Sequence, residues 1–514
     1  MGTRTPPARA GRREWLGLGV IALPCLLYSM DLTVLNLAIP RLTADLRPSG
    51  AQLLWIVDVY GFLVAGSLIT MGTLGDRIGR RRLLMLGAAA FGVGSVLAAF
   101  STSAEMLIAT RALLGVAGAT LAPSTLSLIR NMFLDARQRT VAIGIWVTSY
   151  SVGAAIGPLL GGIVLEYFWW GSVFLLGVPV MALLLAVGPS LLPEFRDPHA
   201  GRLDLPSAAL SLCAVLLMIY GLKRVAESGP IALALGAIGL GAALAVVFVR
   251  RQRRLADPLI DLGLFRAPAF SAALVTYLIA CFVGFGAYVF IAQYLQLVLG
   301  LSPLQAGLWT LPSMLSYVVA ALLVPRLTAR VRPAPLMAGG LVLAAMGFVA
   351  LARVDAEGGL AVLVVGSVLY SLGLSPVVIL ATDLVVGSAP PERAGAASAI
   401  SETSAELGGA LGIALLGSVG TAVYRRAMRG AVPFGVAPDS AEAARATLGG
   451  AVATAESLPP ALGVALLDPA REAFVQGLQL GVLACGVLVL ATAAMTWRQL
   501  RDAGAATPVG AKAG

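Results

Sequence analysis

The sequence has little histidine and cysteine, and each shortage excludes a class of site. His199 is the only histidine among 514 residues, so no zinc or haem site is expected. The four cysteines lie in four separate apolar runs and predict no disulfide framework; they are Cys25, Cys213, Cys281 and Cys485. No glycine-rich loop is followed by Lys and then Ser or Thr, so no phosphate-binding loop for ATP is expected. We therefore predict no metal and no cofactor.

Charge is scarce as well. Only 12% of the residues are charged, 58% are hydrophobic, and the mean hydropathy is +0.90. This composition is too apolar for a water-soluble globular protein and favours a lipid bilayer as the surroundings, with no nucleic acid as a partner. The first apolar run begins behind Arg12, Arg13 and Glu14 and ends without a small-residue cleavage site. It predicts a retained helix and not a signal peptide.

Apolar stretches long enough to cross about 30 Å of hydrocarbon recur along the whole chain. We count fourteen, near 15–36, 51–71, 83–101, 104–128, 139–164, 170–190, 204–222, 230–249, 269–294, 303–325, 334–352, 358–384, 394–423 and 473–497. An even number puts both termini on one side. Of the 36 Lys and Arg residues, 25 fall on that side, 10 on the other, and Arg111 lies inside a stretch. Positive charge favours the inner side, so we expect a multi-pass protein of the cytoplasmic membrane with both termini in the cytoplasm.

Polar links divide these stretches into groups. PEFRDPHAGRLD precedes the stretch near 204–222, and the basic segment Arg250–Arg266 follows the next one. We predict an all-α membrane protein of two six-helix bundles with two intervening helices. The expected divisions are an N-terminal bundle over 1–195, the intervening helices over 196–255, a C-terminal bundle over 256–501 and a cytoplasmic tail over 502–514.

The C-terminal bundle carries a long outer loop over 425–472 that is rich in Ala, Gly and Pro. Two pieces of it, SAEAARATLGGAVATAE and LPPALGVALLDPAREAF, predict short helices that begin at Ser440 and Asp468 as caps. Such helices can fold as a hairpin over the outer mouth. A disordered tether is equally compatible with the composition.

The segment SVGAAIGPLLGGIVL, 151–165, carries a stripe of glycines on one helix face. Gly153, Gly157 and Gly161 recur every fourth residue, and Gly162 and Ala154 are expected to widen the stripe. Small residues at this spacing let another backbone approach closely in lipid. Pro158 lacks an amide hydrogen and is expected to bend the helix at that point. A helix contact with no further role explains the spacing as well.

Two further features place charge at the membrane. The turn GTLGDRIGRRRLLMLG, 72–87, contains one acid and four arginines; Asp76 and Arg80 are four apart and can join two helix ends, although a plain topogenic charge cluster also explains the arginines. Arg111 lies in LIATRALLGVAGATLAP, followed by Gly115, Gly118 and Ala119. A guanidinium inside a bilayer must face a polar cavity or a carboxylate, unless it lies near the outer end and reaches the interface.

These motifs together resemble those of the major facilitator superfamily. The turn at 72–87 resembles its cytoplasmic loop signature, the Arg111 run its helix 4 motif, and the glycine stripe its antiporter motif GxxxGPxxGG. LPCLLYSMDLTVLNLAIPRL and LLWIVDVYGFLVAG match the first-helix signature of the fourteen-helix drug:proton antiporter family, especially the QacA and LfrA type. The resemblance continues through LAPSTLSLIRN, IDLGLF, LGLSPLQAGL and AGAASAISETSAELGGALG. It implies the major facilitator fold, with conformational roles for Gly75, Asp76, Arg77, Gly79, Arg80, Arg81, Gly153, Gly157, Pro158, Gly161 and Gly162.

Carboxylates stranded in low dielectric can hold a proton near neutral pH or, when ionised, a lipophilic cation. The candidates are Asp31, Asp58, Glu402 and Glu406, with Asp383 and Glu166 behind them. Glu402 and Glu406 share one helix face, so their like charges favour one protonated member. The resemblance implies that Asp31 is the essential acid and that Asp58 and the two glutamates are proton or cation sites, with Arg111 beside them. Asp58 and Glu166 also fit wet interfacial acids, and Asp383 fits a cytoplasmic helix end.

Aromatic rings recognise large organic cations through the ring face. Those in or near helices expected to line a central cavity are Tyr28, Trp55, Tyr60, Trp146, Tyr150, Phe285, Tyr294 and Trp309. Interface anchoring is the alternative role for each. Where the QacA pattern has an acid linked to divalent cations, this chain has Tyr317. Cations of single charge are therefore expected to be handled better than bis-cationic ones.

We expect a monomeric proton-coupled antiporter that exports lipophilic cationic drugs, dyes and quaternary ammonium antiseptics. An exporter of an endogenous lipid or metabolite, with incidental drug efflux, is the alternative. A membrane-embedded enzyme is disfavoured because no catalytic His or Cys constellation exists, and a sensor is disfavoured because the sequence contains no soluble output domain.

Overall fold

The computed structural model describes residues 9–48, 50–196, 204–226, 231–255, 258–356, 358–390 and 393–500. Every regular element in these ranges is a helix, which confirms the prediction of an all-α protein. Helices satisfy their own backbone hydrogen bonds, and this is the form that an apolar chain must take in lipid.

The N-terminal half begins with one of the longest helices of the described chain and ends before the polar link at 197–203. Its elements are α1 (Arg12–Leu46), α2 (Gly50–Ile78), α3 (Arg80–Ala99), α4 (Ala104–Gly118), α5 (Leu121–Met132), α6 (Ala136–Tyr167), α7 (Ser172–Leu175) and α8 (Gly177–Leu191). The stretch predicted near 104–128 is interrupted by a turn at Ala119 and Thr120. Pro123 follows in the first turn of α5, where a missing amide hydrogen is tolerated.

Two intervening helices and the C-terminal half follow. The elements are α9 (Leu205–Ala226), α10 (Ile231–Gln252), the short η1 (Leu264–Arg266), α11 (Pro268–Gln293), the π turn η2 (Tyr294–Val298), α12 (Pro303–Thr328), α13 (Pro333–Leu351), α14 (Leu360–Ser388), α15 (Ala394–Met428), α16 (Pro438–Ala446), α17 (Leu448–Glu456) and α18 (Pro460–Leu500).

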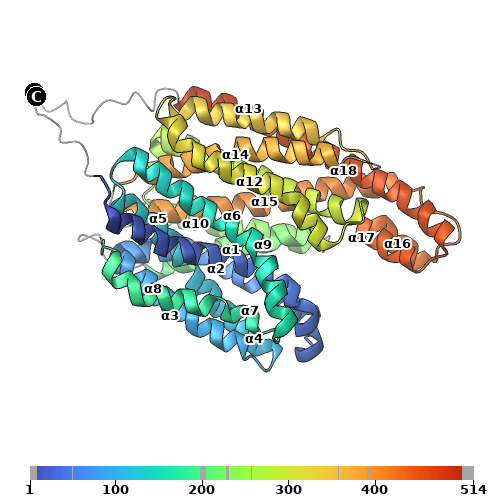
Figure 1. Cartoon of the computed structure of the whole chain (residues 1–514), viewed down its shortest axis with the longest axis horizontal. Helices are drawn as coiled ribbons and strands as arrows, with labels where there is room; N and C mark the ends of the chain where they lie inside the picture. The colour runs from blue at the N-terminus through green and yellow to red at the C-terminus, as the bar shows by residue number, and fades with distance from the viewer. Residues whose placement is uncertain are drawn as a thin grey trace, which may run out of the picture.

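The two halves lie side by side (Figure 1). They contact each other through α2 with α15, α6 with α12, and α5 with α15. The start of α1 and the end of α18 lie at one end of the molecule, here called the terminal end. The α16–α17 pair marks the opposite end, here called the hairpin end. The intervening α9 packs against both α2 and α15, so it covers the junction between the halves.

Twelve helices among the described residues are long and apolar enough to cross a membrane, and they include α9 and α10. The multi-pass architecture is thereby supported. Fourteen stretches were expected, and the two of them that correspond to α1 and α6 are not among these twelve. Both of these helices exceed 30 residues, at 35 and 32, and they pack against each other.

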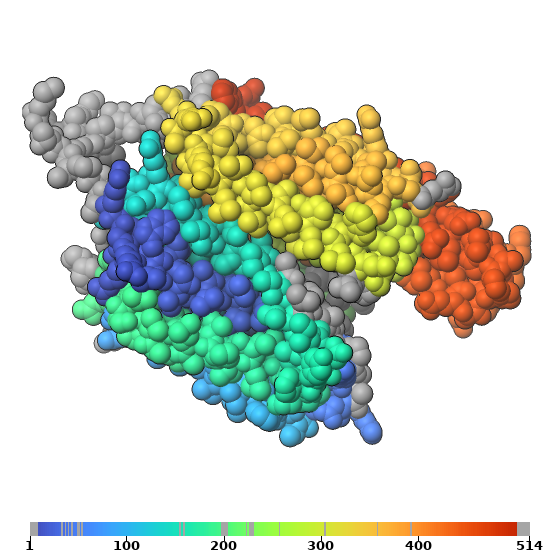
Figure 2. All heavy atoms as spheres, in the orientation of Figure 1, coloured from blue at the N-terminus to red at the C-terminus, as the bar shows by residue number. Residues whose placement is uncertain are grey.

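The segment over 425–472, which was expected to be an outer loop, forms helices that pack as a hairpin and is not a disordered tether. It packs on the C-terminal half, where α17 contacts α18 and α16 contacts α15. Figure 2 shows it projecting beyond the other helices. The predicted caps were wrong, because Ser440 lies inside α16 and Asp468 lies inside α18. The cap that the structure shows here is Thr447, whose hydroxyl accepts a hydrogen bond from the backbone of Gly450 at 3.1 Å.

The glycine stripe of α6 packs on α1. A Cβ at Gly153 would strike the carbonyl oxygen of Leu26, and one at Gly161 would lie 2.7 Å from the Val34 side chain. Gly157 is buried between them. Gly162 does not widen the stripe, because it is exposed with nothing within 4 Å. The side chains of Ala154 and Pro158 lie outside the described residues, and α6 itself continues from Ala136 to Tyr167.

The same packing recurs in the C-terminal half. A Cβ at Gly408 of α15 would lie 2.5 Å from the Leu278 carbonyl of α11, and one at Gly412 would strike the Phe282 carbonyl. The pair α11–α15 thus repeats the pair α1–α6. Close backbone approach at small residues is how helices associate in lipid, and these two pairs bring α1 and α15 to the middle of the molecule.

Candidate functional site

Asp31 of α1 and Arg111 of α4 form an ion pair inside the N-terminal half. Arg111 Nη1 donates to Asp31 Oδ2 at 2.6 Å, and Arg111 Nε donates to the Ile56 carbonyl at 3.2 Å. The Arg111 side chain is 1% exposed, so it does not reach the interface. The alternative role as an interfacial arginine is therefore excluded. Removing either partner of such a pair leaves a buried charge alone, which costs several kcal/mol.

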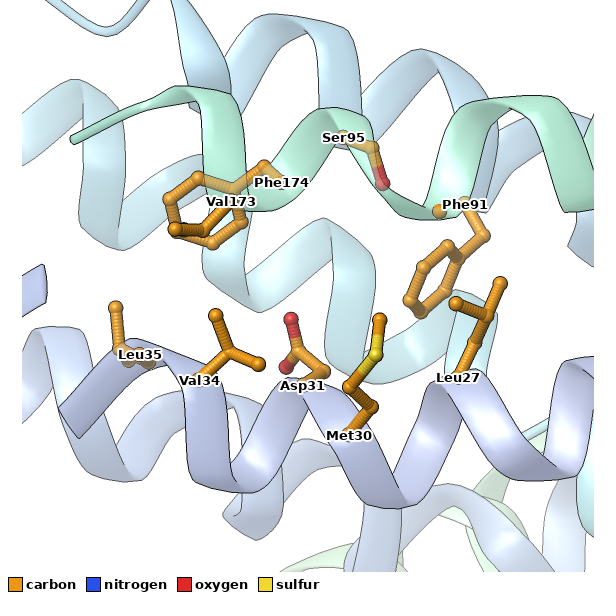
Figure 3. Close-up of a pocket in the computed structure, with 10 residues that line it drawn as sticks. Leu27, Met30, Asp31, Val34, Leu35, Phe91, Ser95, Val173 and Phe174 are labelled. Carbon is orange, nitrogen blue, oxygen red and sulfur yellow. The ribbon is translucent and has the colours of Figure 1, made fainter. Parts of the chain in front are cut away.

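A small cavity opens beside this pair. It has a volume of about 20 Å³ and is bordered by Asp31, Phe91, Ser95 and Phe174. Figure 3 shows the Asp31 carboxylate pointing from α1 toward this space. The volume suits about one water molecule. Asp31 therefore has room for a small polar guest on the side that Arg111 does not occupy.

Tyr60 of α2 packs against the Arg111 guanidinium. The Arg111 Cζ is 4.5 Å from the centre of the Tyr60 ring, a cation–π contact. The glycines that follow Arg111 permit this approach: a Cβ at Gly115 would lie 2.7 Å from the Tyr60 carbonyl oxygen, and one at Gly118 would lie 3.2 Å from its hydroxyl. The small residues in the Arg111 run thus bring α2 against α4.

Glu402 and Glu406 of α15 face the N-terminal half. Glu406 Oε1 accepts a hydrogen bond from the Tyr28 hydroxyl of α1 at 2.9 Å. Glu402 Oε1 is buried and has no hydrogen-bond partner in the described part of the chain. Glu402 lies within electrostatic range of Tyr150 of α6 and Tyr277 of α11. A carboxylate thus sits between the two halves with unused acceptor capacity.

Aromatic rings surround these glutamates. The Tyr28 ring packs edge-on against Tyr150 at 5.7 Å and tilted against Tyr60 at 6.1 Å. Tyr150 in turn packs edge-on against Trp146 at 4.9 Å, and the Trp146 indole donates to the Thr125 hydroxyl at 3.0 Å. Tyr317 of α12 is half-buried on the opposite side, near Cys281. We call Tyr28, Tyr60, Trp146, Tyr150, Tyr277 and Tyr317 the aromatic cluster.

Four of the predicted aromatic residues lie outside this cluster. Tyr294 is buried at the hairpin end, where its hydroxyl donates to the Asp355 carbonyl at 2.7 Å. Trp55, Phe285 and Trp309 are 49%, 54% and 43% exposed. Such exposure is typical of aromatic side chains that face lipid or lie at the membrane–water interface, where these rings are stable.

The remaining predicted acids also separate. Asp58 is half-buried on α2, two positions before Tyr60, and therefore does not share its helix face. Glu166 is exposed at the end of α6. Asp383 is near the end of α14 and accepts from Arg139 Nε at 2.5 Å and from the Thr140 hydroxyl at 2.8 Å. It thereby joins the two halves at the terminal end.

The turn at 72–87 also joins the halves. Arg80 Nε donates to Asp76 Oδ1 at 2.9 Å, which holds the end of α2 to the start of α3 as the spacing indicated. Asp76 also accepts the backbone amides of Gly395 and Ala396, at 3.0 and 2.9 Å, from the first turn of α15. A carboxylate at a helix N-terminus is favoured by the free amides and by the helix dipole. The terminal end of the molecule is therefore closed by Asp76 and by the Arg139–Asp383 pair.

The other residues of this turn serve the N-terminal half. Arg81 Nη1 donates to the carbonyls of Pro189 and Leu192, both at 3.0 Å, and Arg77 donates to the Thr73 carbonyl at 3.4 Å. Gly79 has φ +108°, which strains any residue with a side chain. Gly75 lies in α2, one turn before it.

A model of the Major Facilitator Superfamily matches residues 21–413. The chain belongs to this superfamily. Its members are membrane transporters, in keeping with the expectation of a protein that is not an enzyme.

The sequences of several known proteins align with almost the whole of this chain. The "Multidrug efflux pump LfrA" of Mycolicibacterium smegmatis is 45% identical over 493 residues, 96% of each chain. The "Methyl viologen resistance protein SmvA" of Salmonella typhimurium is 38% identical over 96% of this chain and 99% of its own. The "Tetracenomycin C resistance and export protein" of Streptomyces glaucescens is 30% identical over 96% of this chain and 92% of its own.

Two solved structures share the fold. The crystal structure of the human organic anion transporter MFSD10 (TETRAN) superposes with a TM-score of 0.58 at 17% identity, over 94% of this chain and 100% of that chain. A bacterial homologue of the human lysosomal transporter Spinster, in an inward-facing and unoccupied conformation, superposes with a TM-score of 0.53 at 18% identity. The match covers 95% of this chain and 99% of that chain. The major facilitator fold expected from the motifs is therefore confirmed.

Sequence reasoning missed Tyr277 and Arg139. Tyr277 lies one helical turn before Cys281 on α11, and both lie near Glu402. A polar ring inside an otherwise apolar stretch was the available signal. Arg139 resembled one more topogenic arginine, and only the fold pairs it with Asp383. In the described residues, no group of three or more His, Cys, Asp or Glu could hold a metal ion.

Proposed function

We propose that this superfamily member is a proton-coupled antiporter that exports lipophilic cationic drugs, dyes and quaternary ammonium antiseptics across the cytoplasmic membrane. Its relatives bear names of multidrug efflux, methyl viologen resistance and tetracenomycin C export, and this supports drug efflux in general. The choice of cations and of protons as the counter-substrate rests on the site.

One observation carries the proposal: Glu402 is a half-buried carboxylate among aromatic rings, and its buried Oε1 is an acceptor that no described group satisfies. An isolated ionised carboxylate is unfavourable in low dielectric, so it must take up a proton or a cation. A lipophilic cation suits this position because ring faces attract its charge and the rest of it is apolar. Proton and drug then compete for one group, which is the basis of exchange.

The charged groups near the site have different roles in this proposal. Asp31 is matched by Arg111, so the pair contributes no net charge to the site. Glu402 and Glu406 are therefore the groups that we assign to the organic cation, and their proximity favours one proton between them when no drug is bound. Each elementary charge that crosses about 100 mV is worth roughly 2.3 kcal/mol, which is enough to drive export without a nucleotide.

We assign the terminal end to the cytoplasm, in line with the distribution of Lys and Arg. The contacts of Asp76 and of Arg139 with Asp383 then close the cytoplasmic side, and this conformation faces outward. We further propose that α1 and α6 also cross the bilayer and complete fourteen spans, and that the transporter works as a monomer. Alternating access requires the contacts at the cytoplasmic side to break in each cycle.

We further propose that the protein prefers substrates with a single positive charge. Tyr317 supplies no carboxylate on α12, so we propose that ethidium, with one positive charge, is exported better than methyl viologen, with two. The relative SmvA is named for methyl viologen resistance, so the two cations test whether the Glu402–Glu406 pair serves dications in this chain as well.

Transport into proteoliposomes tests the function. We expect an imposed pH difference to drive ethidium uphill, a protonophore to abolish this, and proton movement to accompany each dye gradient. Asp31→Asn should lose the uphill transport, and its melting temperature in detergent shows whether it still folds.

Proton release on ethidium addition to purified protein, repeated with Asp31, Asp58, Glu402 and Glu406 each neutralised, identifies the exchanging acid. Equal dye movement in wild type without any pH difference or voltage, and without proton movement, overturns antiport.

A further inference from the structure

Tyr28 connects the two halves at the level of the proposed cation site. Its hydroxyl, on α1, donates to Glu406 Oε1, on α15, at 2.9 Å. Tyr28 is 8% exposed, so water competes little for this bond. Donor and acceptor are 378 positions apart in the sequence and belong to opposite halves. Any rocking of one half against the other at this level must break the bond.

The same tyrosine is connected to the ion pair through Tyr60. Asp31 follows Tyr28 by three positions on α1, so the two side chains lie on neighbouring parts of one face. The Tyr28 ring packs on Tyr60, and the Tyr60 ring holds the Arg111 guanidinium at 4.5 Å. Asp31, Arg111, Tyr60, Tyr28 and Glu406 therefore form one continuous series of contacts from the N-terminal half to the C-terminal half.

The strength of the Tyr28 bond depends on the charge of its acceptor. A hydrogen bond from a neutral donor to an ionised carboxylate is about twice as strong as one to a neutral group. Glu406 is a strong acceptor when it is empty and ionised. It becomes a weaker one when a proton neutralises it or when a bound organic cation draws on its oxygens.

We propose that Tyr28 is a positioning residue that holds the halves together while Glu406 is empty, and releases them when a proton or an organic cation occupies the site. This inference rests on the proposed antiport. An antiporter must reorient with proton or drug bound and must not reorient empty, because empty reorientation turns exchange into leak. The Tyr28 bond provides this restriction, since it is strongest in the empty state alone.

Several titratable groups face Glu406 and share this equilibrium. They are Glu402 on its own helix, Tyr28 of α1, Tyr60 of α2 and Cys281 of α11. Asp31 and Arg111 interact with Tyr60 and lie one contact further away. Arg111 and Asp31 compensate each other. Glu402 is thus the neighbour whose negative charge adds to that of Glu406. A proton on Glu402 alone leaves Glu406 ionised, so the release of Tyr28 requires a proton or cation at Glu406 itself.

Tyr28→Phe tests the proposal, because it removes the hydroxyl and keeps the ring. In proteoliposomes with an outward dye gradient, the number of protons that move against each ethidium is measured with an internal pH dye. We expect this ratio to fall severalfold in Tyr28→Phe, because empty reorientation rises about tenfold when a hydrogen bond to a charged group is lost. The Kd for ethidium should fall and not rise, since the ring contact remains and loss of the hydroxyl removes the bond that favours empty Glu406.

Tyr424→Phe is the matched control. Its hydroxyl, also on α15, donates to the Ala444 carbonyl at 2.7 Å near the hairpin, far from the site, and its loss should leave the ratio unchanged. A wild-type proton ratio in a folded Tyr28→Phe overturns the role of Tyr28 and leaves antiport standing. Absence of proton movement in the wild type overturns antiport itself.

Discussion

At the residue scale, the site owes its properties to carboxylates in three different environments. Asp31 is neutralised by Arg111, Glu406 accepts the Tyr28 hydroxyl, and Glu402 Oε1 has no hydrogen-bond partner among the described residues. The three side chains have similar chemistry, and their partners alone distinguish them. In the proposed function, Glu402 is therefore the acceptor that a cation would meet between the halves.

Replacing Glu402 by glutamine should preserve the shape and remove the charge. We expect ethidium to bind about tenfold more weakly or worse, because an interaction with a charged group contributes about 1.5–3 kcal/mol. Fluorescence titration of purified protein measures the Kd. Glu166→Gln, an exposed acid at the end of α6, is the control and should bind as wild type does. Unaltered affinity in Glu402→Gln would place the cation elsewhere.

At the element scale, glycines decide which helices meet. Gly153 and Gly161 admit α1 to α6, Gly408 and Gly412 admit α11 to α15, and Gly115 admits α2 to α4. In lipid the apolar side chains gain nothing by leaving the solvent, so close packing at such positions supplies the association. The two central helices of the site, α1 and α15, are each held by one of these stripes.

Gly153→Ala and Gly162→Ala form a matched pair on one helix. Alanine favours a helix over glycine by about 1 kcal/mol at either position. At Gly153 the new Cβ strikes the Leu26 carbonyl, whereas at Gly162 it meets nothing within 4 Å. We expect Gly153→Ala to lose about 1–3 kcal/mol from this overpacking and to lower the melting temperature in detergent, with reduced efflux. Gly162→Ala should melt at or above the wild-type temperature.

The intervening helices are joined by a bidentate ion pair at the terminal end. Arg251 donates to both Asp204 oxygens, at 2.8 and 2.9 Å. These bonds, with the Ser207 hydroxyl, lower the pKa of Asp204 to about 2. Since the folded pKa lies below the unfolded value of about 3.9, the contribution of the carboxylate to stability is full above about pH 4 and is lost as the pH falls through 2.

Asp204→Asn should therefore melt slightly below wild type between pH 5 and pH 7, because the neutral amide cannot form the charged pair. The difference is expected to shrink as the pH falls from about 4 toward 2, where wild type is protonated as well. Thermal melts in detergent at several pH values measure it. A difference that persists unchanged at the lowest pH contradicts the ion pair as its source.

At the scale of the whole molecule, the halves are held at the terminal end by contacts that must break for the cycle to proceed. The Arg139–Asp383 pair is half-buried, with side chains 14% and 13% exposed, and Asp76 binds the first turn of α15. The nearby Arg393–Asp261 pair, at 3.2 Å, is 35% and 38% exposed. Shielding from water makes the first pair the stronger one.

Asp383→Asn should shift the equilibrium toward opening at the terminal end. Loss of a shielded hydrogen-bonded charge is worth roughly tenfold in that equilibrium, whereas Asp261→Asn, which breaks the exposed pair, should change it about twofold or less. Electron–electron distance measurements between spin labels at exposed Arg137 of α6 and Ser388 of α14 report the opening. Equal distance distributions in Asp383→Asn and wild type would show that this pair does not hold the halves.

The sequence by itself determined the membrane location, the helices and the chemistry of the site. Apolar stretches in lipid can only be helices, a guanidinium among them requires a carboxylate, and a four-residue glycine repeat requires a close neighbour. Charged and aromatic residues within the apolar stretches identified Asp31, Arg111, Glu402, Glu406, Tyr28, Tyr60, Trp146 and Tyr150. Tyr317 was identified only through the resemblance to the QacA pattern. The sequence alone did not separate Trp55 and Tyr294 from the aromatic cluster, because aromatic residues in a cavity and at an interface show the same sequence pattern.

Only the tertiary structure decided which of these groups meet. Tyr28 and Glu406 are 378 positions apart, Asp76 and Gly395 are 319 apart, and Arg139 and Asp383 are 244 apart. Local periodicity states which face of a helix is polar but not which helix it faces. That choice depends on the packing of the two halves, which places Tyr28 against Glu406 and leaves Glu402 between them. Small residues allow this approach as well, because a Cβ at Gly72 of α2 would lie 2.5 Å from the Gly395 carbonyl of α15.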